Sequence, residues 1–284
     1  MDLDVVVCVK NEAEELDYVL RQITALIPFK NLIVIYGTSR DNTEAVAKKY
    51  TDQVFWDEDK GLGAARNLGV VKASSEIVTM IDSDVILDKS WYGQLIEQFK
   101  DPNCAAAIGT CIYGYGCKPI ESYWEYIRHT GKDNLGCHNT MFRRRHVLNV
   151  GNFNPTIKGA GEDYDLYWRL KRAGYNWVWV RNASVYHPVG IAEYFRHLLW
   201  WTRGKPYMDE IVAQLKAISL FRWYCRESLL VAKSFWVGLK ISFKENPTLM
   251  FSYPAVMAAM AYARMSGLKK LSLENNKSTR ALSF

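Results

Sequence analysis

The chain has 284 residues, enough for one large α/β core or for one core with an appendage. Its formal net charge of +6 is uneven: from Gly190 onward 14 lysines and arginines stand against 6 acids, whereas the residues before Gly190 are nearly neutral. Because apolar residues are interleaved with these charges, the cationic part suits anionic membrane lipids and argues against a nucleic-acid partner.

The cysteines and the N-terminus indicate the compartment. The six cysteines, at positions 8, 104, 111, 117, 137 and 225, contain no Cys-x-x-Cys pair, so the sequence suggests neither a zinc site nor a disulfide framework. The segment Met1 to Asp4 is acidic, whereas a signal peptide begins with a basic region. We therefore expect no signal peptide and a reducing, cytoplasmic setting.

The first 82 residues alternate between short apolar runs, typical of buried strands, and amphipathic segments, typical of helices. Strands are expected at residues 5–9, 32–35, 53–56 and 77–82, and the intervening helices are expected to end near residues 26, 50 and 73. Such alternation at short spacing predicts a parallel, doubly wound α/β sheet whose ligand crevice lies at the carboxyl ends of the strands.

The stretch from Lys60 to Asp84 carries the strongest chemical signal. Lys60 and Arg66 could neutralise phosphates, and Gly61 opens a glycine-rich run that lets backbone approach a ligand. The strand that follows ends in Asp82 and Asp84, which are two residues apart and therefore point to one side of an extended chain. Two carboxylates there suit Mn²⁺ or Mg²⁺ bound to a diphosphate. The alternative is a surface turn that caps the next helix.

This combination resembles family 2 glycosyltransferases, in which a Lys/Arg-Gly-x-Gly-x-Ala-Arg-Asn stretch precedes a strand ending in Asp-x-Asp. The resemblance implies a GT-A fold, with a mostly parallel, Rossmann-like sheet flanked by helices, and a nucleoside-diphosphate sugar as donor. It also implies that Glu12 contacts the donor nucleotide. At the position of Tyr36-Gly37 the family usually has an acid that holds the nucleotide base. In this chain Asp41 could take that role, or Tyr36 could stack on the base. Helix capping is the alternative for Glu12 and Asp41.

Two later segments extend the resemblance. In the segment from Gly159 to Leu166 it implies that Asp163 is the catalytic base, with Glu162 near the acceptor. The alternative is structural, because acids are favoured at helix N-termini. Residues 136–145 resemble the segment that lines the sugar pocket, and the arginines at 143–145 could guide an anionic donor or form a solvated face.

Residues nearer the C-terminus match less completely. His187 ends an expected strand, the second of two at 177–180 and 183–187, where some GT-A enzymes place a third metal ligand; a hydrogen-bonding role is the alternative. Residues 194–204 partly resemble the Gln-x-x-Arg-Trp region of membrane-bound, cellulose-synthase-like members. That resemblance would place His197, Trp201 and Arg203 on the acceptor and diphosphate side.

The last third of the chain points to a membrane. From Leu220 to Phe243 apolar residues cover most of a helix, and five cations form a stripe within about 40° of its circumference at 100° per residue: Arg222, Arg226, Lys233, Lys240 and Lys244. A second, uncharged segment runs from Thr248 to Ala263. The two could form a transmembrane hairpin, lie in the interface, pack as a helical layer on the core, or form a dimer interface. Residues 266–284 are basic and polar and are expected to fray.

We therefore predict a GT-A catalytic domain over residues 1–204, a membrane-associated helical segment over 205–265 and a basic tail over 266–284. The predicted activity is inverting, metal-dependent transfer of a hexose to a hydroxyl of a polyprenyl- or dolichyl-linked glycan at the cytoplasmic face of the cell membrane. GDP-mannose is the first candidate donor and a UDP-hexose the second. The alternatives are a polyprenyl-phosphate sugar synthase, related to the dolichyl-phosphate-sugar branch, and a non-catalytic protein that binds sugar nucleotides at the membrane. The oligomeric state stays open.

Overall fold

The computed structural model describes residues 1–131, 134–202, 204 and 220–281. Its contacts group the chain into two units. The first unit comprises residues 1–114 and 131–188, and the second comprises residues 115–130 and 189–284. The functional boundaries expected near residues 204 and 265 stay predictions.

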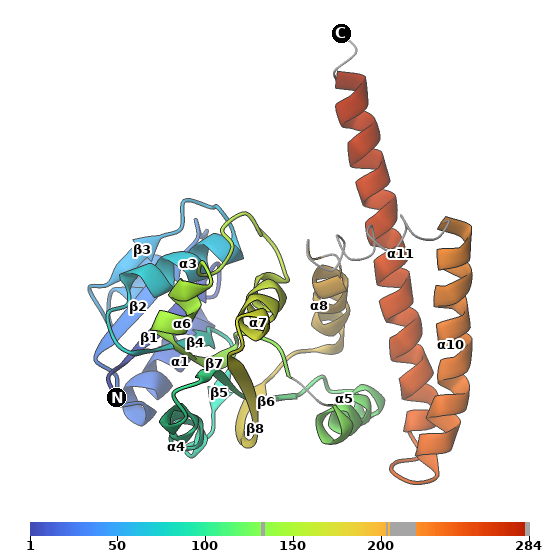
Figure 1. The fold of residues 1–284 in the computed structure, drawn as a ribbon, viewed down its shortest axis with the longest axis horizontal. Helices are drawn as coiled ribbons and strands as arrows, with labels where there is room; N and C mark the ends of the chain where they lie inside the picture. The colour runs from blue at the N-terminus through green and yellow to red at the C-terminus, as the bar shows by residue number, and fades with distance from the viewer. Residues whose placement is uncertain (132–133, 203, 205–219, 282–284) are drawn as a thin grey trace. The chain divides into compact units, whose positions relative to one another are not determined.

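The described part of the first unit contains one eight-stranded sheet, in the order β3-β2-β1-β4-β7-β6-β8-β5 (Figure 1). The strands are β1 Leu3–Val9, β2 Asn31–Tyr36, β3 Val54–Trp56, β4 Ile77–Asp82, β5 Ile86–Leu87, β6 Cys104–Tyr113, β7 Asn139–Arg143 and β8 Asn176–His187. The pairs β2–β3, β1–β2, β1–β4 and β6–β8 are parallel. The pairs β4–β7, β6–β7 and β5–β8 are antiparallel.

The first four strands lie where the sequence predicts them, and they pair in parallel. Beyond β4 the sheet is mixed, in contrast to the expectation of a mostly parallel sheet: β7 runs antiparallel between β4 and β6, β5 runs antiparallel to β8, and β6 and β8 are parallel. The two strands expected at 177–180 and 183–187 are one strand, β8. Arg181 and Asn182 interrupt the apolar pattern, yet they lie exposed within β8, where the register against β6 shifts.

Helices cover both faces of the sheet, since successive residues of a strand point to opposite faces. One face carries α1 Ala13–Leu26, α2 Thr43–Ala47, α4 Trp91–Ile96 and the 3₁₀ helix η1 Glu97–Lys100. There Val5 and Val7 of β1 are buried in the same cluster as Leu16 and Leu20 of α1. The other face carries α3 Leu62–Lys72, α6 Arg144–Asn149 and α7 Glu162–Arg172. There Val6 of β1 is buried in the same cluster as residues of α3 and α7. This is the α/β architecture that the alternating sequence predicts.

The second unit is helical. Its described helices are α5 Lys118–Thr130, α8 Ile191–Thr202, α10 Leu220–Ser242 and α11 Leu249–Ala281, and α11 contacts the other three. Tyr123, Leu249 and Val256 form its buried apolar cluster. Both expected C-terminal helices are present, but α11 continues to Ala281, so the expectation that residues 266–284 fray is wrong for the described part. Among the described residues, no helix combines the length and the apolarity that a membrane span requires.

Candidate donor-binding and catalytic site

The two acids of the Asp-x-Asp motif lie at the carboxyl end of a central buried strand, as the sequence predicts. β4 ends at Asp82, which is in register with Cys8 on the parallel strand β1. Asp84 follows in the next turn, and its Oδ2 lies 2.7 Å from Nε2 of His187, the last residue of β8. Two side chains 103 residues apart are thus brought together at one edge of the sheet.

Asp82 faces a different partner, Arg66 of α3. Its Oδ1 accepts a hydrogen bond of 3.0 Å from Arg66 Nη2, while Nη1 of the same guanidinium donates to Glu162 Oε1 at the start of α7. Arg66 and Glu162 are both buried. Burial opposes the positive charge, but the Glu162 carboxylate holds the pKa of Arg66 well above its usual value. The sequence assigned Arg66 to the donor diphosphate; in the structure its guanidinium joins two acids of the site.

Burial raises the pKa of Glu162, against the opposing effect of the Arg66 charge. The ion pair with Arg66 fixes the side chain of Glu162 at the first turn of α7, and it thereby links α7 to α3. The predicted position of Glu162 near an acceptor stays a prediction. Its second oxygen, Oε2, is buried with no hydrogen-bond partner among the described residues.

The glycine-rich run has a role that the sequence did not predict. Gly61 has φ +99°, and a Cβ there would lie 2.5 Å from the carbonyl oxygen of Lys158. That carbonyl accepts the N–H of Leu62 at 3.2 Å, and the carbonyl of Ile157 accepts that of Gly63 at 3.1 Å. The close backbone approach expected for a ligand is thus made to the chain itself. Lys60, expected to neutralise phosphate, is exposed and pairs with Glu58.

Asp163, the predicted base, lies in the first turn of α7, directly after Glu162. It is half-buried, and its Oδ1 accepts the N–H of Tyr164 at 2.7 Å. Its charge acts on the pKa of both Arg66 and His138, so it lies in the same cluster as the acids of β4. The structure places Asp163 at the site, and its catalytic role stays a prediction.

The sequence missed His138, which lies in this cluster. Its carbonyl accepts the N–H of Asp82 at 3.1 Å, which places it directly beside β4. Burial lowers the pKa of the imidazole, which is therefore neutral at pH 7, and the charges of Asp82, His187, Arg66 and Asp163 all act on it. Its Nε2 is buried and has no hydrogen-bond partner among the described residues. Its place in the segment expected to line the sugar pocket was the available signal.

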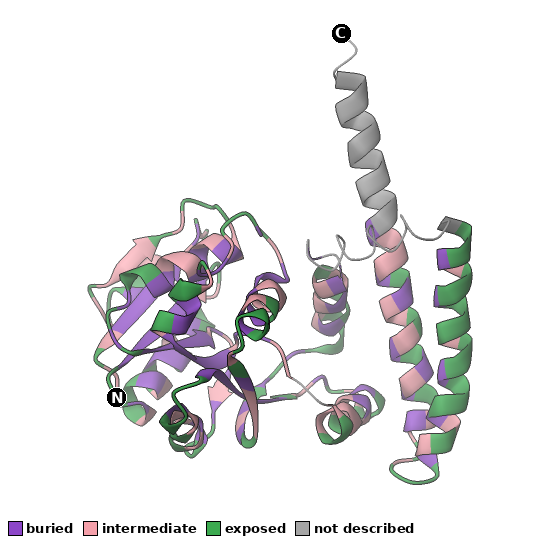
Figure 2. Ribbon diagram, in the orientation of Figure 1, coloured by how far each residue is buried: buried purple, intermediate pink, exposed green. Residues whose placement is uncertain are grey.

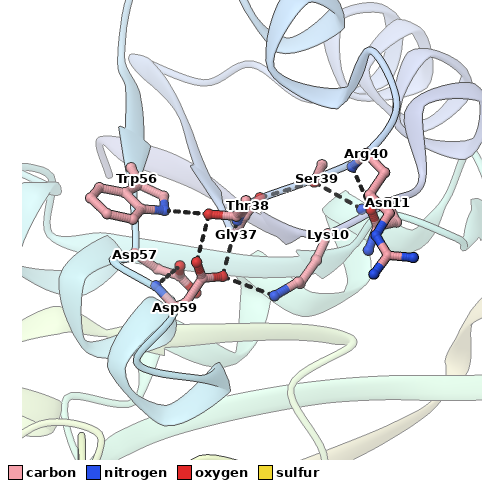
Figure 3. Close-up of polar contacts among 9 residues, drawn as sticks. All are labelled: Lys10, Asn11, Gly37, Thr38, Ser39, Arg40, Trp56, Asp57 and Asp59. Atoms are coloured by element: carbon pink, nitrogen blue, oxygen red, sulfur yellow. Dashed lines mark hydrogen bonds and ion pairs between the residues drawn. The ribbon is translucent and has the colours of Figure 1, made fainter.

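A polar pocket of about 660 Å³ opens at the carboxyl ends of β1 and β2 and the loop after β3, lined by Lys10, Asn11, Thr38, Arg40, Asp41 and Asp59. Figure 3 shows the polar contacts among these residues other than Asp41. Asp59 holds one wall, because it accepts from Lys10 Nζ at 2.8 Å and from the Thr38 N–H at 3.1 Å. On the other side Asn11 Oδ1 accepts the N–H of Arg40 at 2.8 Å. Sequence reasoning also missed Asp59, although an acid in the loop directly after a strand end was a usable signal.

Asp41 has the capping role that was the alternative in the sequence. Its Oδ2 accepts the N–H of Ala13 at the start of α1, at 3.0 Å, and its Oδ1 accepts that of Thr43, at 3.1 Å. The Thr43 hydroxyl also donates to Asp41 Oδ1. This hydrogen bond has the largest effect in lowering the pKa of Asp41, and the two backbone N–H groups add to it. Asp41 therefore secures the loop at the pocket rim.

Glu12 lies beside the Asp-x-Asp turn. Its Oε2 accepts a hydrogen bond from the hydroxyl of Ser83, between the two aspartates. Burial raises the pKa of Glu12 to about 7, the Ser83 hydrogen bond opposes this, and the charges of Asp84 and Asp82 add to it. The contact with the donor nucleotide that the resemblance implied stays a prediction.

The raised pKa of Glu12 predicts a pH dependence of stability. Folded protein keeps the proton up to about pH 7, whereas the unfolded chain releases it near 4.5, so ionisation of Glu12 lowers the free energy of unfolding as pH rises from 4.5 to 7. Glu12→Gln cannot ionise and should lack this loss. The Tm of wild type minus that of Glu12→Gln should therefore fall from pH 5 to pH 7 in thermal unfolding. Glu14→Gln, at an exposed position of the same helix, is the matched control. A difference that stays constant over this range would contradict the assignment.

Other predicted residues belong to other elements of the chain. His197 and Trp201 lie on α8 in the second unit, where His197 Nε2 is 3.1 Å from Glu193 Oε1. Arg203 lies outside the described residues. Arg143 is buried and donates to the carbonyl of Phe99 at 2.6 Å, so the idea that it guides a donor is wrong.

The structure brings together two of the three predicted metal ligands, Asp84 and His187. Across the described ranges, no three His, Cys, Asp or Glu side chains converge as a set of metal ligands. Asp84 and His187 do present an oxygen and a nitrogen 2.7 Å apart at the strand ends. Binding of Asp82 to a metal stays a prediction, because its carboxylate faces Arg66.

Comparison with known proteins agrees with this arrangement. The model of the family described as "Glycosyl transferase family 2" matches residues 4–158, more than half of the chain. Glycosyltransferase AglE of Haloferax volcanii is 25% identical over 206 residues, which are 66% of this chain and 66% of its own. Poly-beta-1,6-N-acetyl-D-glucosamine synthase of Staphylococcus aureus is 35% identical over 190 residues, 58% of this chain and 44% of its own.

Among solved structures, glucosyl-3-phosphoglycerate synthase from Mycobacterium tuberculosis, in complex with Mg²⁺ and uridine diphosphate, aligns with a TM-score of 0.48 and 20% identity. The alignment covers 66% of this chain and 70% of that one. The matched region spans 44% to 66% of the length of the two curated relatives. The family match, the α/β sheet and the motifs at its strand ends agree, and the chain belongs to glycosyl transferase family 2.

Proposed function

We propose that the protein is an inverting, metal-dependent glycosyltransferase that moves a hexose from a nucleoside-diphosphate sugar to a hydroxyl of a lipid-linked glycan. The observation that carries this proposal is the chain of ion pairs from Asp82 through Arg66 to Glu162. It joins the end of β4, where acids suited to a metal and a diphosphate lie, to the start of α7, where Asp163 follows. Groups suited to the donor and to the acceptor thus belong to one assembly, as a direct displacement requires.

Asp84 and His187 would hold Mn²⁺ or Mg²⁺, with Asp82 as a second carboxylate at the same strand end. The set fits, because such ions commonly take one or two protein carboxylates together with phosphate oxygens and water. When bound, the ion neutralises the charge that develops on the leaving diphosphate.

Asp163 takes the proton from the acceptor hydroxyl as that oxygen attacks the anomeric carbon. Attack from the side opposite the diphosphate inverts the configuration. Glu162 is held by Arg66 and positions the first turn of α7. The neutral imidazole of His138, with its unpartnered Nε2, is suited to a hydrogen bond with a sugar hydroxyl. His197, Trp201 and Arg203 are kept as the acceptor-side candidates.

The pocket at the ends of β1 and β2 is the place for the nucleoside. Its lining combines donors and acceptors, and Asp59 supplies a carboxylate where the chain has Tyr36-Gly37 in place of an acid. GDP-mannose is the first candidate donor, by analogy with the family, and a UDP-hexose is the second. The name of the Staphylococcus aureus relative supports a hexose in general.

The acceptor is proposed to be a polyprenyl- or dolichyl-linked glycan at the cytoplasmic face of the cell membrane. The cationic, apolar helices after residue 220 support this location. A polyprenyl-phosphate sugar synthase and a non-catalytic membrane protein that binds sugar nucleotides are the alternatives. The first would need no base, and the second would not hydrolyse the donor in the presence of metal.

A thermal-shift screen of GDP- and UDP-sugars with and without Mn²⁺ tests the proposal. A donor at about 100 times its Kd stabilises the folded state by about 2.7 kcal/mol, enough to raise Tm by several degrees. We expect GDP-mannose with Mn²⁺ to give the largest shift and each sugar nucleotide without metal a small one. Slow, metal-dependent hydrolysis of the same donor should accompany the shift. Binding without hydrolysis would favour the non-catalytic alternative, and the absence of a shift with any sugar nucleotide would contradict the proposal.

A further inference from the structure

Helix α10 shows a reversed distribution of side chains. Its buried positions carry mostly small or polar residues: Trp223, Glu227, Ser234, Gly238 and Ser242. Whereas Trp223 is buried, the aromatic residues Phe221, Phe235, Trp236 and Phe243 are exposed, with Phe221 at 77%, Trp236 at 74% and Phe243 at 83%, and Figure 2 shows the helix exposed along much of its length. A helix whose role was only to pack in a soluble unit would bury its large residues and expose its polar ones.

The contacts between α10 and α11 fix this orientation. Gly238 lies so close to α11 that a Cβ on it would be 2.8 Å from the carbonyl oxygen of Leu249. The two helices are also joined by an ion pair: Glu227 of α10 is buried and accepts a hydrogen bond of 3.0 Å from Arg264 Nε of α11. Rotation that buried Trp236 would put a large side chain where only glycine fits and would break this ion pair. The exposed apolar face is therefore a fixed feature of the helix pair.

Cations border the exposed apolar face. At 100° per residue, the exposed residues Phe221, Leu229, Phe235, Trp236 and Phe243 span about 120° of the helix. The adjoining 40° sector holds Arg222, Arg226, Lys233, Lys240 and Lys244, all exposed. The one acid between residues 220 and 244 is Glu227, which is buried on the opposite side. We call this combined apolar and cationic surface the outer face of α10.

We infer that the outer face of α10 binds an anionic lipid surface, with the helix lying along the membrane interface. Aromatic and aliphatic side chains would enter the boundary between headgroups and acyl chains, and the adjoining lysines and arginines would contact the anionic headgroups. A second copy of this chain fits less well, because a two-fold contact through the same face would oppose its cations to one another. The inference rests on the proposed function only for the membrane location, and its test needs no turnover.

The test is flotation of the full-length protein with vesicles of phosphatidylcholine alone or mixed with phosphatidylglycerol. We expect the partition coefficient to be at least 10-fold higher for the anionic vesicles and to fall at 0.5 M salt. The variant Phe235→Ser/Trp236→Ser/Phe243→Ser should lose at least 10-fold in binding. The variant Lys233→Glu/Lys240→Glu should lose the preference for anionic vesicles.

Matched controls lie on the first unit. Tyr18→Ser removes an aromatic side chain that is 50% exposed, Lys89→Glu reverses an exposed charge, and neither should change partitioning. Circular dichroism and the donor-induced thermal shift should be the same in every variant, since all the changed side chains are exposed. A failed donor shift with intact vesicle binding would count against the proposed function alone.

Two results would overturn the inference. One is wild-type protein that binds neither kind of vesicle, or that binds as well after the triple substitution. The other is a lipid-free dimer, seen by light scattering, that the triple substitution dissociates, because the outer face would then be an interface between copies.

Discussion

Asp163→Asn is expected to lower the rate of glycosyl transfer to a hydroxyl acceptor by about 10²–10⁴, the usual contribution of a general base. Asparagine keeps the size of the side chain and can still accept the N–H of Tyr164, but it cannot take a proton. Donor affinity should barely change, because the variant leaves the Asp82–Arg66–Glu162 ion pairs and the nucleoside pocket intact. The measurement is single-turnover transfer with donor binding followed in parallel.

Asp165→Asn is the matched control for this substitution. Asp165 lies two residues further along α7 and pairs with Arg169 at 2.6 Å on the same helix. Its loss should cost only about 0.3–0.5 kcal/mol of stability and leave the rate unchanged. An Asp163→Asn protein that turns over normally but binds donor poorly would show that the acid is structural. Normal turnover with a phosphate acceptor alone would favour the polyprenyl-phosphate sugar synthase.

Asp84→Ala should reduce transfer below detection and abolish the Mn²⁺-dependent part of donor binding. The variant removes the carboxylate that lies 2.7 Å from His187, and with it the pair best placed to hold the ion. The donor diphosphate would then lie beside Asp82 with less neutralising charge. Isothermal titration with donor, with and without Mn²⁺, measures the loss, and Asp88→Ala, an exposed acid in the following turn, should leave both signals intact.

Asp82→Ala should also lower activity, but mainly through a loss of stability rather than through a loss of metal binding. It deprives the buried Arg66 of one of its two acidic partners and so should lower the free energy of unfolding. A large fall in Tm for Asp82→Ala with a small one for Asp84→Ala would separate the two roles. Full activity of Asp84→Ala in the presence of a chelator would rule out the metal site.

The parts of the site that sequence reasoning placed correctly depend on local pattern. An apolar run that ends in Asp82 predicts both a buried strand and the edge at which its acids emerge, and the structure confirms both. The direction of β7 was not predictable in the same way, because an apolar strand reads alike in parallel and antiparallel pairing. The single strand β8 was missed because Arg181 and Asn182 look like a turn, whereas a bulge keeps them in the strand.

The contacts that Arg66 and Gly61 make were not predictable, because their partners are distant in the sequence. Glu162 lies 96 residues from Arg66, and the carbonyl of Lys158 that excludes a Cβ at Gly61 is 97 residues away. A cation and a glycine near two aspartates are compatible with a phosphate site and with internal packing, and only the tertiary contacts decide between them.

The contacts between α3 and residues 157–162 also bear on how the chain folds. The match to the family model ends at residue 158, yet the carbonyls of Ile157 and Lys158 accept the first N–H groups of α3, and Glu162 pairs with Arg66, the buried arginine of that helix. A fragment cut at that boundary would keep strands β1 to β7 but would deprive the buried Arg66 of Glu162, one of its two acidic partners. We therefore expect the cooperative folding unit of this protein to be longer than the segment that the family model matches, because Glu162 of α7 contributes to its stability.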